Sequence, residues 1–161
     1  MSVTNEPSDG DYQPSPSERV REQVARYEAT DGREGGTLEG RPVVILTTRG
    51  ARTGQVRKRP VIRIEQDGSY AAVASAAGAP RNPQWYYNLL AHPLVRVQDR
   101  DRIRLMRARE LTGPEKARWW AVAEAYWPHF PEYRASAGRE IPIMLLQPAD
   151  DEPGPGMSPE R

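Results

Sequence analysis

Hydrophobic and polar positions along this chain follow two periods, one of two residues as in strands and one of about 3.6 residues as in helices, and the shorter period dominates. Residues 42–48 form an unbroken run typical of a buried strand. Residues 60–65 alternate apolar and polar positions, as a strand exposed on one face does. Further segments have strand character, namely residues 70–75, 94–98, 103–109 and 141–146. Because turn residues such as Asp67-Gly68 separate neighbouring segments, six antiparallel strands linked by hairpins are predicted.

The longer period predicts a helix near the N-terminus. Ser15 is its predicted cap and Glu18 completes a capping box. Asp31-Gly32 is a typical helix end. Spacings of four and three residues predict one buried face, made of Val20, Val24 and Tyr27.

Two more helices are predicted in the second half of the chain. Asn82 is the expected cap of a short helix that stops before Pro93, since proline disfavours a helical conformation at the residue before it. Thr112 and Glu115 form a second capping box ahead of a longer helix. A proline-interrupted turn follows at residues 128–139. Six strands and three or four helices predict an α+β, mainly β fold: an antiparallel barrel with helices packed outside.

Length and composition indicate a single folded domain. Residues 1–14 and 149–161 are polar, acidic and rich in Pro, Gly and Ser, so we expect unfolded tails around a domain at residues 15–148. The chain has no cysteine and only two histidines, which excludes disulfides and thiolate chemistry and argues against a metal site. We expect no transmembrane segment and no secretory signal, and therefore a cytoplasmic location.

Charge is distributed unevenly, although the chain as a whole is nearly neutral, with 23 basic and 22 acidic residues. The segment 41–64 holds no acidic residue, and its basic residues are Arg41, Arg49, Arg52, Arg57, Lys58, Arg59 and Arg63. They surround a turn bounded by Gly50 and Gly54. Free amides and the side chains of Arg52, Thr53 and Arg57 could bind a phosphate or carboxylate there. The alternative is a solvated basic hairpin.

A second constellation spans residues 75–88. A predicted strand ends at Ser75, a loop of small residues follows, and a helix then begins. Open amides at a helix start favour an anionic or polar group, and Trp85 and Tyr86 offer flat apolar surface for a ring. The alternative is an ordinary strand-to-helix connection with core aromatics. A third group, Trp127, Phe130 and Tyr133, has three-residue spacing that is more often typical of a core stripe than of a cofactor contact.

Residues 46–57, residues 75–88 with their Asn-Pro-x-Trp-Tyr core, and residues 139–143 together resemble the deazaflavin-dependent nitroreductase and quinone reductase family, which uses coenzyme F420. The resemblance covers about residues 36–148. It implies a split β-barrel of the FMN-binding-like type, with the deazaflavin in a groove on the barrel. The reaction it implies is hydride transfer from the reduced deazaflavin to an electron-poor acceptor, a quinone or nitro compound.

The same resemblance implies roles for individual residues. The phosphate and glutamate tail of the cofactor would lie against Ala51, Arg52, Thr53, Arg57 and Lys58. The ring would lie against Pro60, Val61, Ile62, Ala74, Ser75 and Ala76, and the pocket would be completed by Asn82, Gln84, Trp85 and Tyr86. The acceptor would be lined by Trp127, Phe130 and Tyr133. Ser75 and Tyr133 are the predicted catalytic residues, and no metal is implied.

Some positions depart from the family pattern. Ala76 stands where many relatives have a basic residue, a role that Arg81 is placed to replace. Ile62, Trp127 and Phe130 stand where nitro-reducing members carry tyrosine, so the family name does not identify the acceptor.

Three alternatives remain at this point. They are a split barrel that binds FMN, a carrier of coenzyme F420 without turnover, and a barrel that binds single-stranded nucleic acid. The nearly neutral charge and the acidic tails argue against nucleic acid. Peripheral contact with a membrane, as a lipid quinone would require, is also left open.

Overall fold

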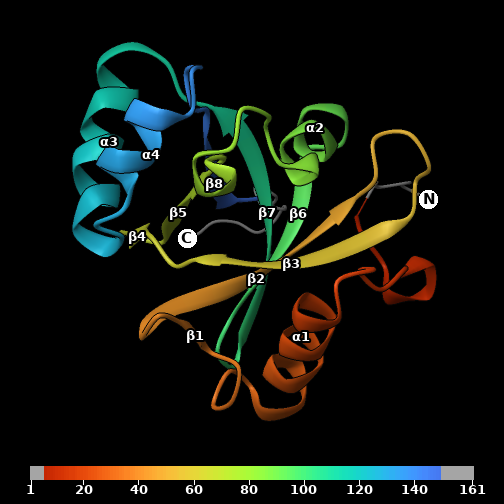
Figure 1. The fold of residues 1–161 in the computed structure, drawn as a ribbon. Coiled ribbons are helices and arrows are strands. Elements are labelled where there is room, and N and C mark those ends of the chain that lie inside the picture. The colour runs from red at the N-terminus through yellow and green to blue at the C-terminus, as the bar shows by residue number, and fades with distance from the viewer. Residues whose placement is uncertain (1–5, 150–161) are drawn as a thin grey trace, which may run out of the picture.

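An antiparallel sheet curled into a barrel forms the centre of the molecule (Figure 1). The computed structural model describes residues 6–149. Within that range the strands are β1 (Thr37–Leu38), β2 (Arg41–Arg49), β3 (Val56–Ile62), β4 (Glu65–Gln66), β5 (Ser69–Val73), β6 (Leu94–Asp99), β7 (Arg102–Glu110) and β8 (Ile143–Pro148). They are hydrogen-bonded in the order β1-β2-β6-β7-β8-β5-β4, and β3 pairs with β2.

The sheet closes because one stretch of chain serves both of its edges. β3 pairs with β2 at one edge and continues through Arg63 and Ile64 into β4 at the other edge. The amide of Ala71 in β5 donates to the carbonyl of Ile64 at 2.9 Å, which joins this connection to the far side of the barrel. The fold is a split β-barrel, as predicted.

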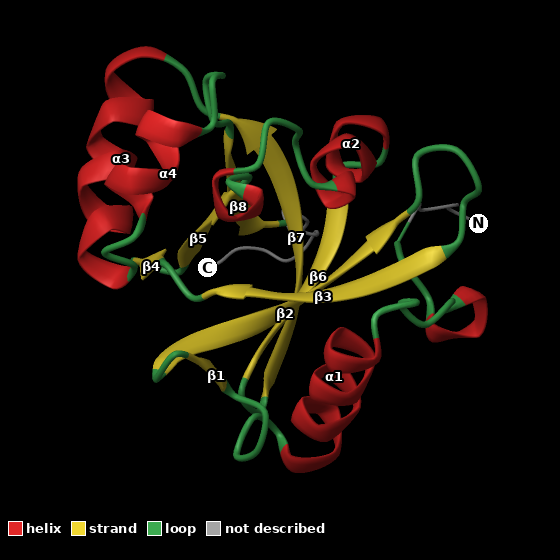
Figure 2. Cartoon of the chain, viewed as in Figure 1, coloured by secondary structure: helices red, strands yellow, loops and turns green. Residues whose placement is uncertain are grey.

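Helices pack around the outside of the barrel (Figure 2). In the described part of the chain they are α1 (Glu18–Thr30), α2 (Gln84–Ala91), α3 (Gly113–Tyr126) and α4 (Phe130–Ser136), with short 3₁₀ turns η1 (Asp9–Asp11) and η2 (Ala76–Gly78). α1 lies below β2 and β3 in the view of Figure 1, whereas α3 and α4 lie together beside β5. α4 occupies the segment predicted as a proline-interrupted turn.

The apolar run in β2 is unbroken because both faces of this strand are covered. Val44 and Leu46 point into the barrel core. Val43 and Ile45 point outward, against the predicted apolar face of α1, where Tyr27 is fully buried. The three buried positions predicted for α1 are therefore confirmed, and α1 covers this side of the barrel.

Six of the strands correspond to the six predicted from the sequence, with several shifted boundaries; β3 ends at Ile62 rather than at residue 65, and β5 ends at Val73 rather than at residue 75. β3 begins at Val56 rather than at residue 60, because pairing with β2 extends from Arg49 opposite Val56 to Val43 opposite Ile62. β8 begins at Ile143 rather than at residue 141. The Asp67-Gly68 turn joins β4 to β5 with positive φ at both residues, as predicted for a hairpin.

The predicted caps are the least accurate part. Ser17 rather than Ser15 caps α1, since the Ser17 hydroxyl accepts from the amide of Val20. Pro83 rather than Asn82 precedes α2, and no side chain caps that helix. Thr112 is at the cap position of α3 but makes no side-chain cap hydrogen bond.

Residues 6–14, expected to be unfolded, lie against the barrel. Tyr12 forms a bridge to Val56 in β3, and the amide of Gln13 donates to the carbonyl of Val56 at 2.9 Å. Asp9 forms ion pairs with Lys58 and Arg96, which attach this segment to the sheet. The rest of the predicted tails, residues 1–5 and 150–161, lies outside the described residues. None of the helices within residues 6–149 is long and apolar enough to span a bilayer.

Candidate functional site

A groove of about 550 Å³ runs along β3, between the β2–β3 hairpin and α4. Fifteen of the predicted site residues line it: Ala51, Arg52, Thr53, Arg57, Lys58, Pro60, Val61, Ile62, Ser75, Ala76, Gln84, Trp85, Trp127, Phe130 and Tyr133. Three sequence segments that lie far apart along the chain therefore meet at one site, as the resemblance implies.

One end of the groove is basic. The turn between β2 and β3 is closed by a hydrogen bond from the Gly50 amide to the Gln55 carbonyl at 2.7 Å. A side chain at Gly50 would place its Cβ about 3 Å from the Thr53 hydroxyl and the Gln55 carbonyl, so the close turn favours glycine. Arg52 is exposed and Arg57 is half-buried. Within residues 6–149 neither guanidinium forms an ion pair, so both are available for an anion.

Asn88 holds this turn in place from α2. Its side chain is 1 % exposed, accepts from the amide of Ala51 at 3.0 Å and donates to the hydroxyl of Thr48 at 3.1 Å. Gln84 also donates to it at 3.2 Å. Thr48 and Asn88 line the groove but were not singled out as site residues. The available signal was a carboxamide on the apolar face of a helix, where a polar group needs partners.

Lys58 lines the groove, but its charge is already paired within the described residues. Its side chain is 2 % exposed, and its ammonium lies 2.7 Å from Glu28 and 3.1 Å from Asp9. The same nitrogen lies 4.7 Å from the centre of the Tyr12 ring. The positive charge is thus neutralised by α1 and the N-terminal segment instead of facing an anion in the groove. Arg59, which was not predicted as a site residue, also lines the groove.

The floor of the groove is apolar and its far end is aromatic. Pro60, Val61 and Ile62 border it from β3. The Phe130 and Tyr133 rings meet edge to face, with centroids 6.2 Å apart. Trp127 is buried next to them. This end offers a water-poor wall to a flat apolar molecule.

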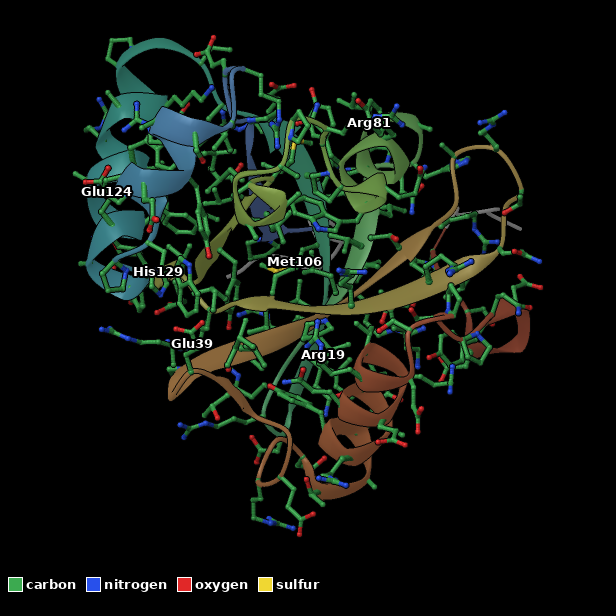
Figure 3. All side chains as sticks on the ribbon, in the orientation of Figure 1. Arg19, Glu39, Arg81, Met106, Glu124 and His129 are labelled. Carbon is green, nitrogen blue, oxygen red and sulfur yellow. The ribbon has the colours of Figure 1, made fainter. Side chains whose placement is uncertain are left out.

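A polar contact bridges the aromatic end. Glu39, in the turn between β1 and β2, lies 3.0 Å from Nε2 of His129, which immediately precedes α4 (Figure 3). The His129 ring stacks on Tyr133 with centroids 5.9 Å apart. Leu38, beside Glu39, lines the groove. The two elements therefore meet across the end of the groove where the acceptor was predicted.

Ser75 lies between the basic and aromatic ends, where β5 runs into η2. It is 8 % exposed, and within residues 6–149 its hydroxyl has no hydrogen-bond partner. Gly78 packs against α4, since a Cβ there would lie 2.8 Å from the Ser136 hydroxyl and 3.3 Å from Cα of Tyr133. The unpaired hydroxyl is therefore carried by a loop that is docked on the helix bearing Tyr133.

Three predicted site residues do not line the groove. Ala74 is completely buried behind it. Asn82 accepts a hydrogen bond from Arg139 and donates to Tyr87, so its amide serves the loop. The Tyr86 hydroxyl donates to Glu110 at 2.8 Å, and burial together with this hydrogen bond raises the pKa of Tyr86 to about 12.

The donor set fits an elongated ligand with two different ends. Unpaired guanidiniums suit phosphate and carboxylate groups at one end, and an apolar floor beside a free hydroxyl suits a polar ring system at the other. Within the described residues this combination is assembled by β3, the Ser75 loop, α2 and α4. The lining of the groove is therefore suited to an amphiphilic anion with a flat head.

Comparison with known proteins gives concordant results. The family model described as F420H(2)-dependent quinone reductase matches residues 19–148. An F420H(2)-dependent quinone reductase of Mycobacterium tuberculosis is 32% identical over 126 residues, which is 76% of this chain and 85% of that protein.

Two solved structures are similar in both fold and sequence. One is described as an F420-H2 dependent reductase; it is 42% identical, with a TM-score of 0.63, and the match covers 66% of this chain and 95% of that one. The other, described as a domain-swapped dimer, is 39% identical with a TM-score of 0.65, over 78% of this chain and 92% of that one.

Proposed function

This chain belongs to the F420H(2)-dependent quinone reductase family, and we propose that it is an enzyme that binds reduced coenzyme F420 in the groove along β3 and reduces a quinone. The observation that carries the proposal is the arrangement of the groove. Arg52 and Arg57, which have no ion-pair partner among residues 6–149, lie at one end, and the Ser75 hydroxyl, which has no hydrogen-bond partner in the same range, lies beside an apolar floor. A nitro compound is a second candidate acceptor, because it is electron-poor in the same way.

The basic end binds the anionic part of the cofactor. Arg52, Thr53 and Arg57 donate to its phosphate and tail carboxylates, and each charge-assisted hydrogen bond contributes about 1.5–3 kcal/mol. Lys58 contributes no free charge, because Asp9 and Glu28 already neutralise it. Tail recognition therefore depends on the arginines of the turn and of β3.

The apolar part of the groove orients the reacting groups. When bound, the reduced deazaflavin supplies the hydride. Pro60, Val61 and Ile62 of β3, with Gln84 and Trp85 of α2, line the part of the groove that would hold the ring. Holding donor and acceptor in contact lowers the barrier, because their alignment no longer has to be found by diffusion.

Ser75 and Tyr133 are the proposed catalytic residues. The Ser75 hydroxyl is free to donate a hydrogen bond to the ring or to the negative charge that arrives on the acceptor oxygen. Tyr133, with Phe130 and Trp127, lines the acceptor side and excludes water. The cytoplasmic location remains a proposal from the sequence.

A binding titration and a turnover assay test this function. Binding is measured first, by fluorescence with coenzyme F420 and with FMN. Tight binding of F420 and weak binding of FMN is the expected result, and the reverse would identify a flavin protein. The protein is then mixed with reduced F420 and a panel of small quinones, and the return of deazaflavin absorbance is followed. Binding without reoxidation across the panel would leave a carrier and remove the enzyme.

A further inference from the structure

Arg139 lies behind the Ser75 loop and is hydrogen-bonded to it at many points. It follows α4 and precedes β8. Its Nε donates to the carbonyl of Ala79 at 3.0 Å, and its Nη2 lies 3.0–3.2 Å from the carbonyls of Ala74, Ser75 and Arg81. Its Nη1 donates to Oδ1 of Asn82. All three guanidinium nitrogens are thus engaged by the segment between β5 and α2.

The loop needs such support because its own sequence cannot fix its shape. Ala76 and Ala77 both have positive φ, at 47° and 56°, a conformation that costs an L-residue about 1–2 kcal/mol. The hydrogen bonds within the loop are short-range, from Gly78 to Ser75 and from Ala79 to Ala76. Arg139 adds five hydrogen bonds that originate outside the loop.

The guanidinium acts on the backbone on both sides of the reactive hydroxyl. The carbonyls of Ala74 and Ser75 both accept from Nη2, at 3.2 Å. The Ser75 hydroxyl has no hydrogen-bond partner of its own in residues 6–149, so this backbone sets where the Cα–Cβ bond of Ser75 enters the groove, and the hydroxyl stays free to turn toward a ligand. Arg139 also has no carboxylate partner within those residues, which distinguishes it from an ordinary structural ion pair.

We infer that Arg139 is a positioning residue: it holds the loop of residues 74–82 so that the Ser75 hydroxyl points at the reacting groups in the groove. This inference rests on the proposed function for the role of Ser75, whereas the support of the loop does not. A lysine cannot replace it, because an ammonium lacks the planar fork that reaches several carbonyls at once.

The first test needs no cofactor. Nη2 of Arg139 bonds the carbonyl of Arg81, which belongs to a peptide bond that trypsin cleaves once the loop opens. Arg139→Ala is expected to speed cleavage after Arg81 by about tenfold or more, and Arg139→Lys to speed it less. Millimolar guanidinium ion should slow it again in Arg139→Ala, while equal urea should not. The matched control is Arg134→Ala, which removes an exposed α4 arginine paired with Glu124 and leaves the loop untouched.

The second test is a double-mutant cycle with Ser75→Ala, measured with reduced F420 and a quinone. Arg139→Ala is expected to lower kcat by about 100-fold, as a misplaced group does, with little change in cofactor affinity. In the Ser75→Ala background the same substitution should change kcat by about twofold or less. Guanidinium ion should restore kcat in Arg139→Ala and not in the double variant.

The outcomes separate the two proposals. If Arg139→Ala lowered kcat equally in the wild-type and Ser75→Ala proteins, or left the rate of cleavage after Arg81 unchanged, the positioning role would be overturned. Turnover by the wild type would still uphold the proposed function. A wild type that neither binds F420 nor reduces a quinone would remove the proposed function and, with it, the catalytic part of this inference. A loss of kcat that depends on Ser75 and is restored by guanidinium ion would establish both the proposed function and the positioning role.

Discussion

Asn88 in α2 accepts a hydrogen bond from the backbone amide of Ala51 in the β2–β3 turn, at 3.0 Å. This contact connects two segments that are 37 residues apart. It fixes the turn that carries Arg52 and Thr53 to the helix that borders the ring end of the groove. The two halves of the proposed cofactor site are therefore held in register by one carboxamide.

Replacing this carboxamide should weaken stability and binding together. Asn88→Ala leaves the Ala51 amide and the Thr48 hydroxyl without their partner, which costs about 1–3 kcal/mol of unfolding free energy. The turn also loses its anchor, so F420 affinity should fall. Denaturant unfolding and a fluorescence titration measure both effects. Thr48→Ser keeps the hydroxyl and is the control; an Asn88→Ala protein with wild-type affinity would show that the turn holds its shape unaided.

Arg57 and Lys58 are adjacent cations with different predicted effects. Arg57→Ala should weaken F420 binding by about tenfold or more, the equivalent of one charge-assisted hydrogen bond, and more for long glutamate tails. Lys58→Met should leave affinity nearly unchanged, because that ammonium is paired with Asp9 and Glu28. It should instead lower stability, since two carboxylates lose their partner. Equal losses of affinity in the two variants would mean that Lys58 turns toward the ligand.

Ala77 provides a test of strain in the Ser75 loop. At φ 56° and ψ 33°, Ala77→Gly should raise the unfolding free energy by about 0.5–1 kcal/mol, because glycine adopts this conformation freely. The matched substitution Ala121→Gly, at an exposed position inside α3, should lower it by about 1 kcal/mol. Denaturant unfolding of both proteins gives the signs. A loss of stability in Ala77→Gly would contradict the strain.

The raised pKa of Tyr70 leads us to expect that the protein loses stability in alkali. Burial, reinforced by the hydrogen bond to Asp99 at 2.5 Å, raises its pKa to about 12 from an ordinary 10.0. The contribution of Tyr70 to the free energy of unfolding is fully present below pH 10, where its phenol is protonated in both the folded and the unfolded chain. It is lost between pH 10 and 12, where only the unfolded chain ionises.

The loss from Tyr70 should amount to about 2–3 kcal/mol. Denaturant unfolding at pH 9 and pH 12 measures it. Tyr70→Phe serves as the control for all other alkaline titrations, and its stability should fall less over the same interval. Parallel losses in the two proteins would show that Tyr70 ionises as easily in the fold as outside it.

The strands were predictable from sequence because the barrel leaves a periodic record. Both faces of β2 are buried, under α1 and inside the barrel, and this gives an unbroken apolar run. The Asp67-Gly68 turn carries its own conformational preference. The start of β3 at Val56 was missed because residues 57–59 are all basic and show no alternation of apolar and polar positions. Only their pairing with β2 makes this stretch a strand.

The site residues were predicted less well where a polar side chain had two potential partners. Asn82 was expected to cap a helix and contact the cofactor, but Arg139 lies 57 residues away in sequence and takes its oxygen. Lys58 was grouped with the free cations because the sequence does not show Asp9 and Glu28 converging on it. Local patterns identify residue types suited to a ligand. Long-range contacts decide which of those residues remain free.

The acidic segment at residues 6–14 has a practical consequence for anyone who trims the chain. A protein cut to start at Ser15 would lose the carboxylates of Asp9 and Asp11, which pair with Arg96 and Arg49, and would leave Lys58 with Glu28 alone. That flank would become a cation-rich surface which retains nucleic acid during purification. Titrations of such a shortened protein would overestimate its affinity for polyanions. Affinities for the glutamate tail should therefore be measured with the full-length chain.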